Sequence, residues 1–138
     1  MRFETMTDEQ LKSEIGEIAD GLPGLDTRSA LNRLGGSPAM YIKFLTKFYD
    51  EYYERGAKLS ELLARKDLFE AHRFVHSIKS LAGNLGADEL YRSALSLEAD
   101  MKRGMVMPSE VEVDNFSDEL SLVLSELNAF LLARGCME

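Results

Sequence analysis

Helical spacing of the apolar residues is the feature that most constrains the fold of this chain. Apolar residues recur three or four positions apart in one segment after another, whereas the two-residue alternation of β-strands is almost absent. Only 3 of the 138 residues are proline, so few positions prevent a helix from continuing. The sequence therefore predicts an all-α protein.

The opening segment, about residues 7–35, carries signals for two short helices. Thr7 and Gln10 form a capping box before the first of them. Asp26 can cap a second, brief helix that stops at the glycine pair beginning with Gly35. We expect these short helices to cover the rest of the fold as a lid.

Four longer helices are expected between about residues 37 and 134, and an interior glycine, Gly56, is expected to bend the first of them. Their ends are marked by capping or helix-breaking residues: Ser37 with Pro38, Asp67, Gly86, Gly104, and Pro108 with Ser109. Short loops between four helices predict an up-down-up-down antiparallel four-helix bundle. The expected core positions include Tyr41, Phe44, Leu45, Phe48, Tyr52, Val75, Ile78, Ala82, Leu90, Leu97, Phe116, Leu120 and Leu127.

Length and composition favour one domain spanning residues 1–138, because 45% apolar and 29% charged residues are a normal globular balance. The formal charge is -8, from 16 Lys and Arg against 24 Asp and Glu, so the chain repels nucleic acid, which we do not expect as a partner. A single cysteine, Cys136, cannot build a multi-thiol metal site and is typical of a reducing compartment. No apolar run resembles a signal peptide or a membrane span. A cytoplasmic protein without membrane contact is therefore expected.

One flank of the helix that follows Asp67 has an unusual composition. At about 100° per residue, the flank that points away from the core stripe contains His72, His76, Lys79, Ser80 and Gly83. His76 should therefore be exposed near the middle of its helix. Its small neighbours would allow the surface of another protein to close over the imidazole ring.

That shape suits phosphoryl transfer, which needs an in-line approach and is catalysed mainly by positioning and charge neutralisation. An unperturbed imidazole is largely neutral and nucleophilic at neutral pH. Lys79, three residues after His76, can neutralise phosphoryl oxygens. His72 and His76 could also be read as a metal-binding pair, but no carboxylate or thiol on this flank completes a zinc site, so no metal is expected.

The run from Val75 to Ala87 closely resembles the signature of the histidine-containing phosphotransfer (HPt) domain. In that signature the histidine is followed by a lysine three positions later, a small residue four positions later, and glycines seven and ten positions later, as in this sequence. The runs Leu22–Asp26 and Leu34–Ser37 resemble the segment that precedes the bundle in HPt domains of multistep kinases. The resemblance covers roughly residues 20 to 130. Ser80 stands where the family usually has glycine, which should change the rate rather than abolish the function.

The resemblance implies a phosphorelay intermediate. His76 would accept a phosphoryl group from a receiver aspartate or a kinase and pass it to a response-regulator receiver domain, while Lys79 stabilises the phosphoryl charge. The chain would need no cofactor of its own, since Mg²⁺ belongs to the receiver, and would have no kinase activity. We expect a monomer whose partners are receiver domains and a sensor or hybrid histidine kinase. The expected docking residues are Phe69, His72, Ser80, Gly83 and Asn84.

Several alternatives remain beside this interpretation. Phe69 could pack partly in the core instead of docking a receiver, and Glu98 lies where some HPt domains place a glutamine near the histidine. The N-terminal phosphoacceptor domain of a chemotaxis-type kinase has a similar motif but would require kinase domains after residue 138. An adaptor that binds without transfer would not need both His76 and Lys79. A di-iron enzyme would need an inward Glu-x-x-His pattern, which the sequence lacks.

Overall fold

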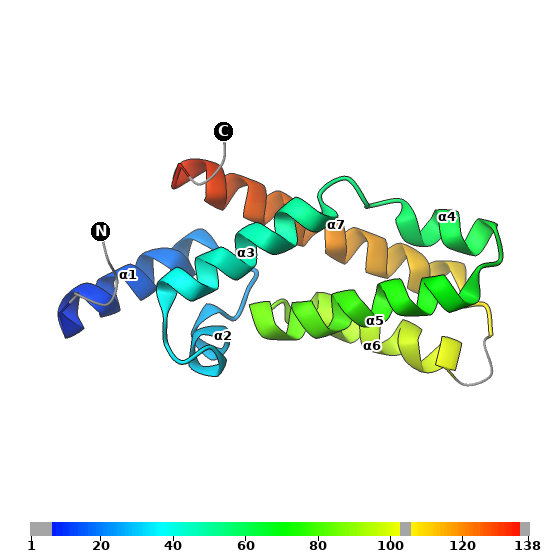
Figure 1. Ribbon diagram of the computed structural model, residues 1–138, viewed down its shortest axis with the longest axis horizontal. Coiled ribbons are helices and arrows are strands. Elements are labelled where there is room, and N and C mark those ends of the chain that lie inside the picture. Colours follow the sequence, from blue (N-terminus) through cyan, green and yellow to red (C-terminus); the bar gives the residue numbers. More distant parts are fainter. Residues whose placement is uncertain (1–6, 103–105, 136–138) are drawn as a thin grey trace.

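The computed structural model describes residues 7–102 and 106–135, and within them it contains seven helices and no strand. The predicted all-α class is therefore confirmed. The helices are α1 (Asp8–Gly21), α2 (Thr27–Arg33), α3 (Pro38–Tyr52), α4 (Lys58–Ala64), α5 (Leu68–Leu85), α6 (Asp88–Lys102) and α7 (Glu110–Ala133). All seven helices contribute buried residues to one core cluster, and α1 and α2 lie toward one end of the molecule (Figure 1).

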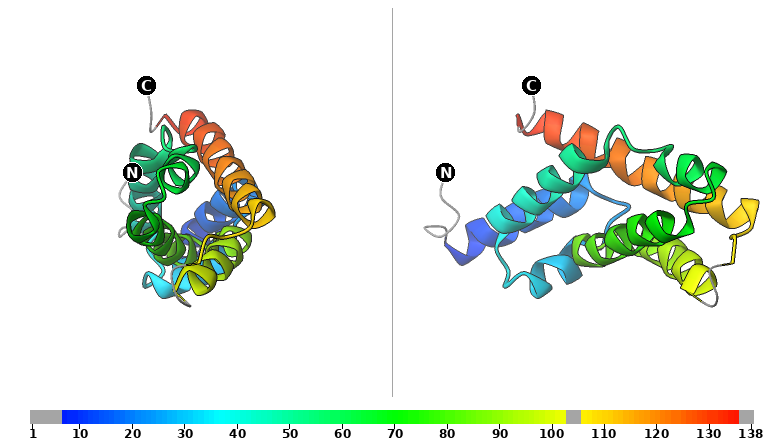
Figure 2. Two further views of the ribbon diagram at one scale, coloured as in Figure 1. Left: turned by 90° about the vertical axis from the view of Figure 1, so that its right-hand side faces the viewer. Right: turned by 45° about the vertical axis from the view of Figure 1, so that its right-hand side comes forward.

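Helices α5 and α6 form an antiparallel hairpin, and they lie side by side in all views (Figures 1 and 2). Gly86 ends α5 with a φ of 83°, as its sequence position predicted. A Cβ atom at Gly86 would lie 2.4 Å from the carbonyl oxygen of Asp26, and the Asp26 N–H donates to the Gly86 carbonyl at 2.8 Å. The turn of the hairpin is thus anchored to the N-terminal segment, and only glycine fits there.

The inner face of α5 is fully enclosed. Val75, Ile78 and Ala82 are 0% exposed, as their helical spacing predicted. At the end of the helix, the hydroxyl of Tyr41 on α3 donates to the Leu85 carbonyl at 2.8 Å, and burial raises the pKa of Tyr41 to about 12. This contact satisfies one of the carbonyls that the end of a helix leaves without a partner. The outer face of α5, with His76, is consequently directed away from a rigid core.

The first long helix differs from the prediction of one helix bent at Gly56. Helix α3 ends at Tyr52 and α4 begins at Lys58, so the helix is interrupted rather than bent. Residues 53–57 are all exposed, so a helix through them would bury no apolar side chain. No burial would then offset the unfavourable helix propensity of Gly56, which is about 1 kcal/mol. Both Tyr52 and Leu59 are nevertheless buried, so the apolar stripe continues across the break. The aromatic stripe of α3 belongs to the core, as predicted.

The predicted helix starts are confirmed by side-chain caps at Thr7, Asp26, Ser37, Asp67 and Ser109. The predicted stop at Gly104 and the lone Cys136 lie outside the described residues. The single domain over residues 1–138 and the up-down-up-down arrangement under a lid stay predictions. Among the described residues, none of the helices combines the length and the apolar character needed to cross a membrane.

Candidate functional site

His76 lies near the middle of α5, and its side chain is 55% exposed. The residues that flank it on the inner side of the helix, Val75 and Ile78, are completely buried. The prediction of an accessible His76 beside buried neighbours is confirmed. The ring is therefore open to solvent while its backbone is held by the core.

Glu98 on α6 connects His76 to Lys79. Its Oε2 lies 2.7 Å from Nδ1 of His76, and its Oε1 accepts a hydrogen bond from Nζ of Lys79 at 2.8 Å. Only 7% of Glu98 is exposed, so its carboxylate depends on these two partners in place of water. The three side chains form one hydrogen-bonded group across the α5–α6 hairpin.

The protonation of this group follows from its contacts. Burial alone would raise the pKa of Glu98, but the hydrogen bonds and charges of Lys79 and His76 outweigh burial and hold the pKa below its usual value of 4.5. Glu98 is therefore ionised at neutral pH and can only accept hydrogen bonds. Because an ionised carboxylate only accepts, Nδ1 of His76 is the donor in this contact, and the tautomer that fits it has its lone pair on Nε2.

Lys79 is less exposed than the helical-face argument predicted. Its side chain is only 18% exposed, because the ammonium group turns toward Glu98 on the neighbouring helix. A helical projection treats α5 alone and cannot include that partner. The ammonium group is thus held beside His76 by the same carboxylate that holds the ring.

His72 lies one turn before His76, and the two rings are stacked at a centroid distance of 6.2 Å with an interplanar angle of 16°. The side chain is half-buried, and its Nε2 is enclosed without a hydrogen-bond partner. The contact that holds the His76 ring is therefore the one with Glu98. Its contact with a docking protein stays a prediction.

The other expected docking residues lie along the same outer side of α5. Phe69 is 64% exposed, which decides against core packing, and the Arg73 guanidinium lies 6.0 Å from the centre of its ring. Ser80 and Asn84 are exposed as well. The side chains around His76 therefore form an accessible surface, although their part in docking stays a prediction.

Gly83 is half-buried and contacts two residues that sequence reasoning did not find. A Cβ atom there would lie 3.3 Å from Cδ1 of Tyr91 on α6, and the Gly83 carbonyl accepts a hydrogen bond from the Arg33 guanidinium on α2. The surface around His76 is therefore built from three helices. Neither Tyr91 nor Arg33 has a local sequence signal that connects it to Gly83.

Glu98 is the residue whose importance the sequence analysis underestimated. It lies four positions after Ala94 and three before Met101, both of which are fully buried, so it belongs to the apolar face of α6. A carboxylate on such a face requires a cation or donor from a neighbouring helix. That argument could have paired Glu98 with the histidine and lysine of α5.

The site therefore combines an imidazole that is 55% exposed with a carboxylate 2.7 Å from its Nδ1, on the outer side of a helix in an all-α fold. The family profile described as Hpt domain matches residues 43–130, which is more than half of the chain, and the protein belongs to this family. Hpt domains carry phosphoryl groups on a histidine in two-component phosphorelays and interact with receiver domains and histidine kinases. No curated protein and no solved structure matches the chain significantly.

Proposed function

We propose that this protein is a phosphorelay intermediate in which Nε2 of His76 accepts a phosphoryl group from a receiver aspartate or a kinase and passes it to a response-regulator receiver domain. The observation that carries this proposal is the 2.7 Å contact between Nδ1 of His76 and an ionised Glu98 on a ring that is half exposed. The contact favours the tautomer with the lone pair on Nε2, in a side chain that is 55% exposed.

In the transfer step, the Nε2 lone pair attacks phosphorus while the bond from phosphorus to the aspartate oxygen breaks, and the aspartate leaves as a carboxylate. The ring gains positive charge during this step because Nδ1 keeps its proton. Glu98 stabilises that charge, since an ionised carboxylate already lies against Nδ1. The chain needs no cofactor of its own and no kinase activity, and Mg²⁺ is supplied by the receiver.

Lys79 has the charge needed to neutralise the incoming phosphoryl oxygens. In the unphosphorylated protein its ammonium group donates to Oε1 of Glu98. Lysine has three donors on a flexible stem, so the ammonium can turn part of its hydrogen bonding toward a phosphoryl group while it stays near Glu98. This role predicts that loss of the cation slows transfer without removing the phosphoacceptor.

The partners of this reaction are receiver domains and a sensor or hybrid histidine kinase, and they dock on the outer side of α5 through the surface around Phe69, His72, Ser80, Gly83 and Asn84. We also propose that the protein acts as a cytoplasmic monomer. Its bundle would consist of α3 continued by α4, then α5, α6 and α7 in up-down-up-down order, with α1 and α2 as the lid.

Transfer of radiolabelled phosphate from a cognate receiver tests the proposal. We expect His76→Gln to abolish acceptance while the far-ultraviolet circular dichroism spectrum is unchanged, and Lys79→Ala to slow it. His72→Gln is the matched control, because it makes the same substitution one turn away and should leave acceptance intact. If His76→Gln still acquires acid-labile phosphate at the wild-type level, or if receivers bind the wild type without transfer, the relay assignment is wrong.

A further inference from the structure

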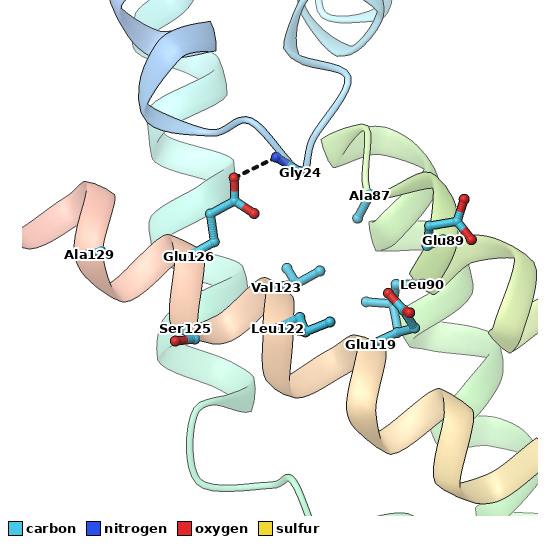
Figure 3. Close-up of a pocket in the computed structure, with 10 residues that line it drawn as sticks. All are labelled: Gly24, Ala87, Glu89, Leu90, Glu119, Leu122, Val123, Ser125, Glu126 and Ala129. Atoms are coloured by element: carbon cyan, nitrogen blue, oxygen red, sulfur yellow. Dashed lines mark hydrogen bonds between the residues drawn. The ribbon is translucent and has the colours of Figure 1, made fainter. Parts of the chain in front are cut away.

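A groove of about 550 Å³ lies between the beginning of α6 and the middle of α7, with the α1–α2 loop at one end (Figure 3). Its floor is apolar. Leu90 and Val123 are buried at the base, whereas Leu122 is 62% exposed, and both α7 side chains are directed toward α6 in the figure. An exposed leucine beside a concave surface is a position where a side chain of another protein can be buried.

The charged residues of this groove are all acidic. Glu89, Glu119 and Glu126 line it, and neither lysine nor arginine is among the described residues that do so. Glu126 accepts a hydrogen bond from the Gly24 N–H at 2.8 Å, which fixes its carboxylate at the loop end of the groove. Glu89 pairs with Arg92, which offsets its charge, so the acidic character of the groove comes from Glu119 and Glu126.

The groove faces away from His76. Glu89 and Glu98 are nine residues apart on α6. At 100° per residue this is a rotation of about 900°, or two and a half turns, which places their side chains on opposite sides of the helix. Glu98 contacts His76 on α5, whereas Glu89 lines the groove beside α7. A protein bound in the groove would therefore leave the phosphoryl site accessible.

Charge complementarity defines what fits this groove. An acidic rim around an apolar floor matches a protein segment that presents lysine or arginine beside a large apolar side chain. A second copy of this chain, which carries a net charge of -8, would be repelled by the same carboxylates.

We infer that the groove between α6 and α7 is a docking site for a basic, amphipathic segment of a partner protein, separate from the surface that exchanges phosphoryl groups. Such a site would keep a partner bound to the protein while receiver domains bind and dissociate at His76. Steering by the acidic rim would make its association rate sensitive to salt.

The probes for this site are three helical peptides of equal length. The first carries leucine and lysine at helical spacing, the second replaces lysine by glutamate, and the third replaces leucine by serine. In titrations followed by amide chemical shifts, the leucine–lysine peptide should shift residues such as Ala87, Leu122 and Ala129 with saturation. The other two peptides should bind at least tenfold more weakly.

Matched variants locate the binding. Glu119→Lys and Leu122→Asp should weaken binding of the leucine–lysine peptide at least fivefold. Glu17→Lys makes the same charge change on exposed α1, and Val111→Asp makes a similar change at an exposed apolar position of α7 outside the groove, so both should bind like the wild type. The inference is overturned if the controls weaken binding equally, or if the shifts centre on α5.

Two further measurements keep this inference distinct from the proposed relay. Phosphoryl acceptance from a receiver should be unchanged at saturating peptide, and a block would overturn the separation of the two surfaces. Sedimentation should show a monomer, because a dimer that Leu122→Asp dissociates would assign the groove to self-association instead. Failure of His76 to accept phosphate would refute the relay but would not alter the peptide titrations.

Discussion

The pair formed by Lys79 and Glu98 should be energetically stronger than a surface ion pair, and a double-mutant cycle with Lys79→Met and Glu98→Gln measures the difference. The two side chains are 18% and 10% exposed, and their charged atoms are 2.8 Å apart. With an effective dielectric constant of about 20, the attraction at that distance is about 6 kcal/mol before desolvation. Since desolvation offsets a large part of it, we expect a coupling energy of about 2 kcal/mol.

A control pair is available on the same helix. Arg73 and Glu70 lie 3.2 Å apart, but their side chains are 65% and 46% exposed. At a dielectric constant near that of water, their attraction is about 1.3 kcal/mol before entropy and screening are subtracted. The corresponding cycle, Arg73→Met with Glu70→Gln, should therefore give a coupling energy of about 0.5 kcal/mol or less.

Urea unfolding followed by circular dichroism at pH 7 measures both cycles. With a slope of about 2 kcal/mol per molar urea, a coupling of about 2 kcal/mol corresponds to a midpoint difference of about 1 M. Equal coupling in the two cycles would refute the argument that enclosure of Glu98 strengthens the pair. Unequal slopes among the variants would show that the unfolded state has changed as well.

The coupling energy between Lys79 and Glu98 should decrease at low pH. The pKa of Glu98 is held below its usual 4.5 in the folded protein by Lys79 and His76, which outweigh burial. The pair therefore contributes its full stability above pH 4.5 and loses it as the pH falls through the folded pKa. Coupling that persists unchanged when Glu98 is protonated would contradict this assignment of charge.

Gly86→Ala should destabilise the fold by more than about 2 kcal/mol in urea unfolding, because the residue has a φ of 83° and its Cβ atom would lie 2.4 Å from a backbone oxygen. Tyr41→Phe should cost about 1 to 2 kcal/mol in the same assay, since it leaves the buried Leu85 carbonyl without its donor; a neutral effect would mean that water replaces the hydroxyl. Gly83→Leu should reduce acceptance from a receiver at least tenfold but leave phosphorylation by the small donor phosphoramidate unchanged, and equal losses with both donors would indicate a disturbed site rather than blocked docking.

Local signals in the sequence predicted a large part of the fold. Helix caps such as Ser37 and Asp67 act within one turn, so their hydrogen bonds to the backbone could be inferred from neighbouring residues alone. The burial of Val75 and Ile78 and the exposure of His76 followed from the helical period. The helical period could not predict the break between α3 and α4, because a continuous helix and a broken one place Tyr52 and Leu59 on the same apolar stripe.

The contacts of the site were less predictable, because they depend on how the helices are placed against each other. The pairing of Glu98 with His76 and Lys79 requires the register of α6 against α5, which no local pattern specifies. The groove beside α7 depends on Gly24 and Glu126, which are 102 positions apart in the chain. The family resemblance indicated His76 as the candidate phosphoacceptor but gave no information on that groove.

The hairpin of α5 and α6 also has a consequence for the order in which the fold assembles. The contacts of Glu98 with His76 and Lys79 span 22 and 19 positions, whereas that of Gly24 with Glu126 spans 102. Because the entropy of loop closure grows with the logarithm of length, closing the longer loop costs about 1.4 kcal/mol more. The hairpin can therefore nucleate early, before the N-terminal segment docks. His76 and Glu98 thus belong to the part of the chain whose assembly depends least on the remainder.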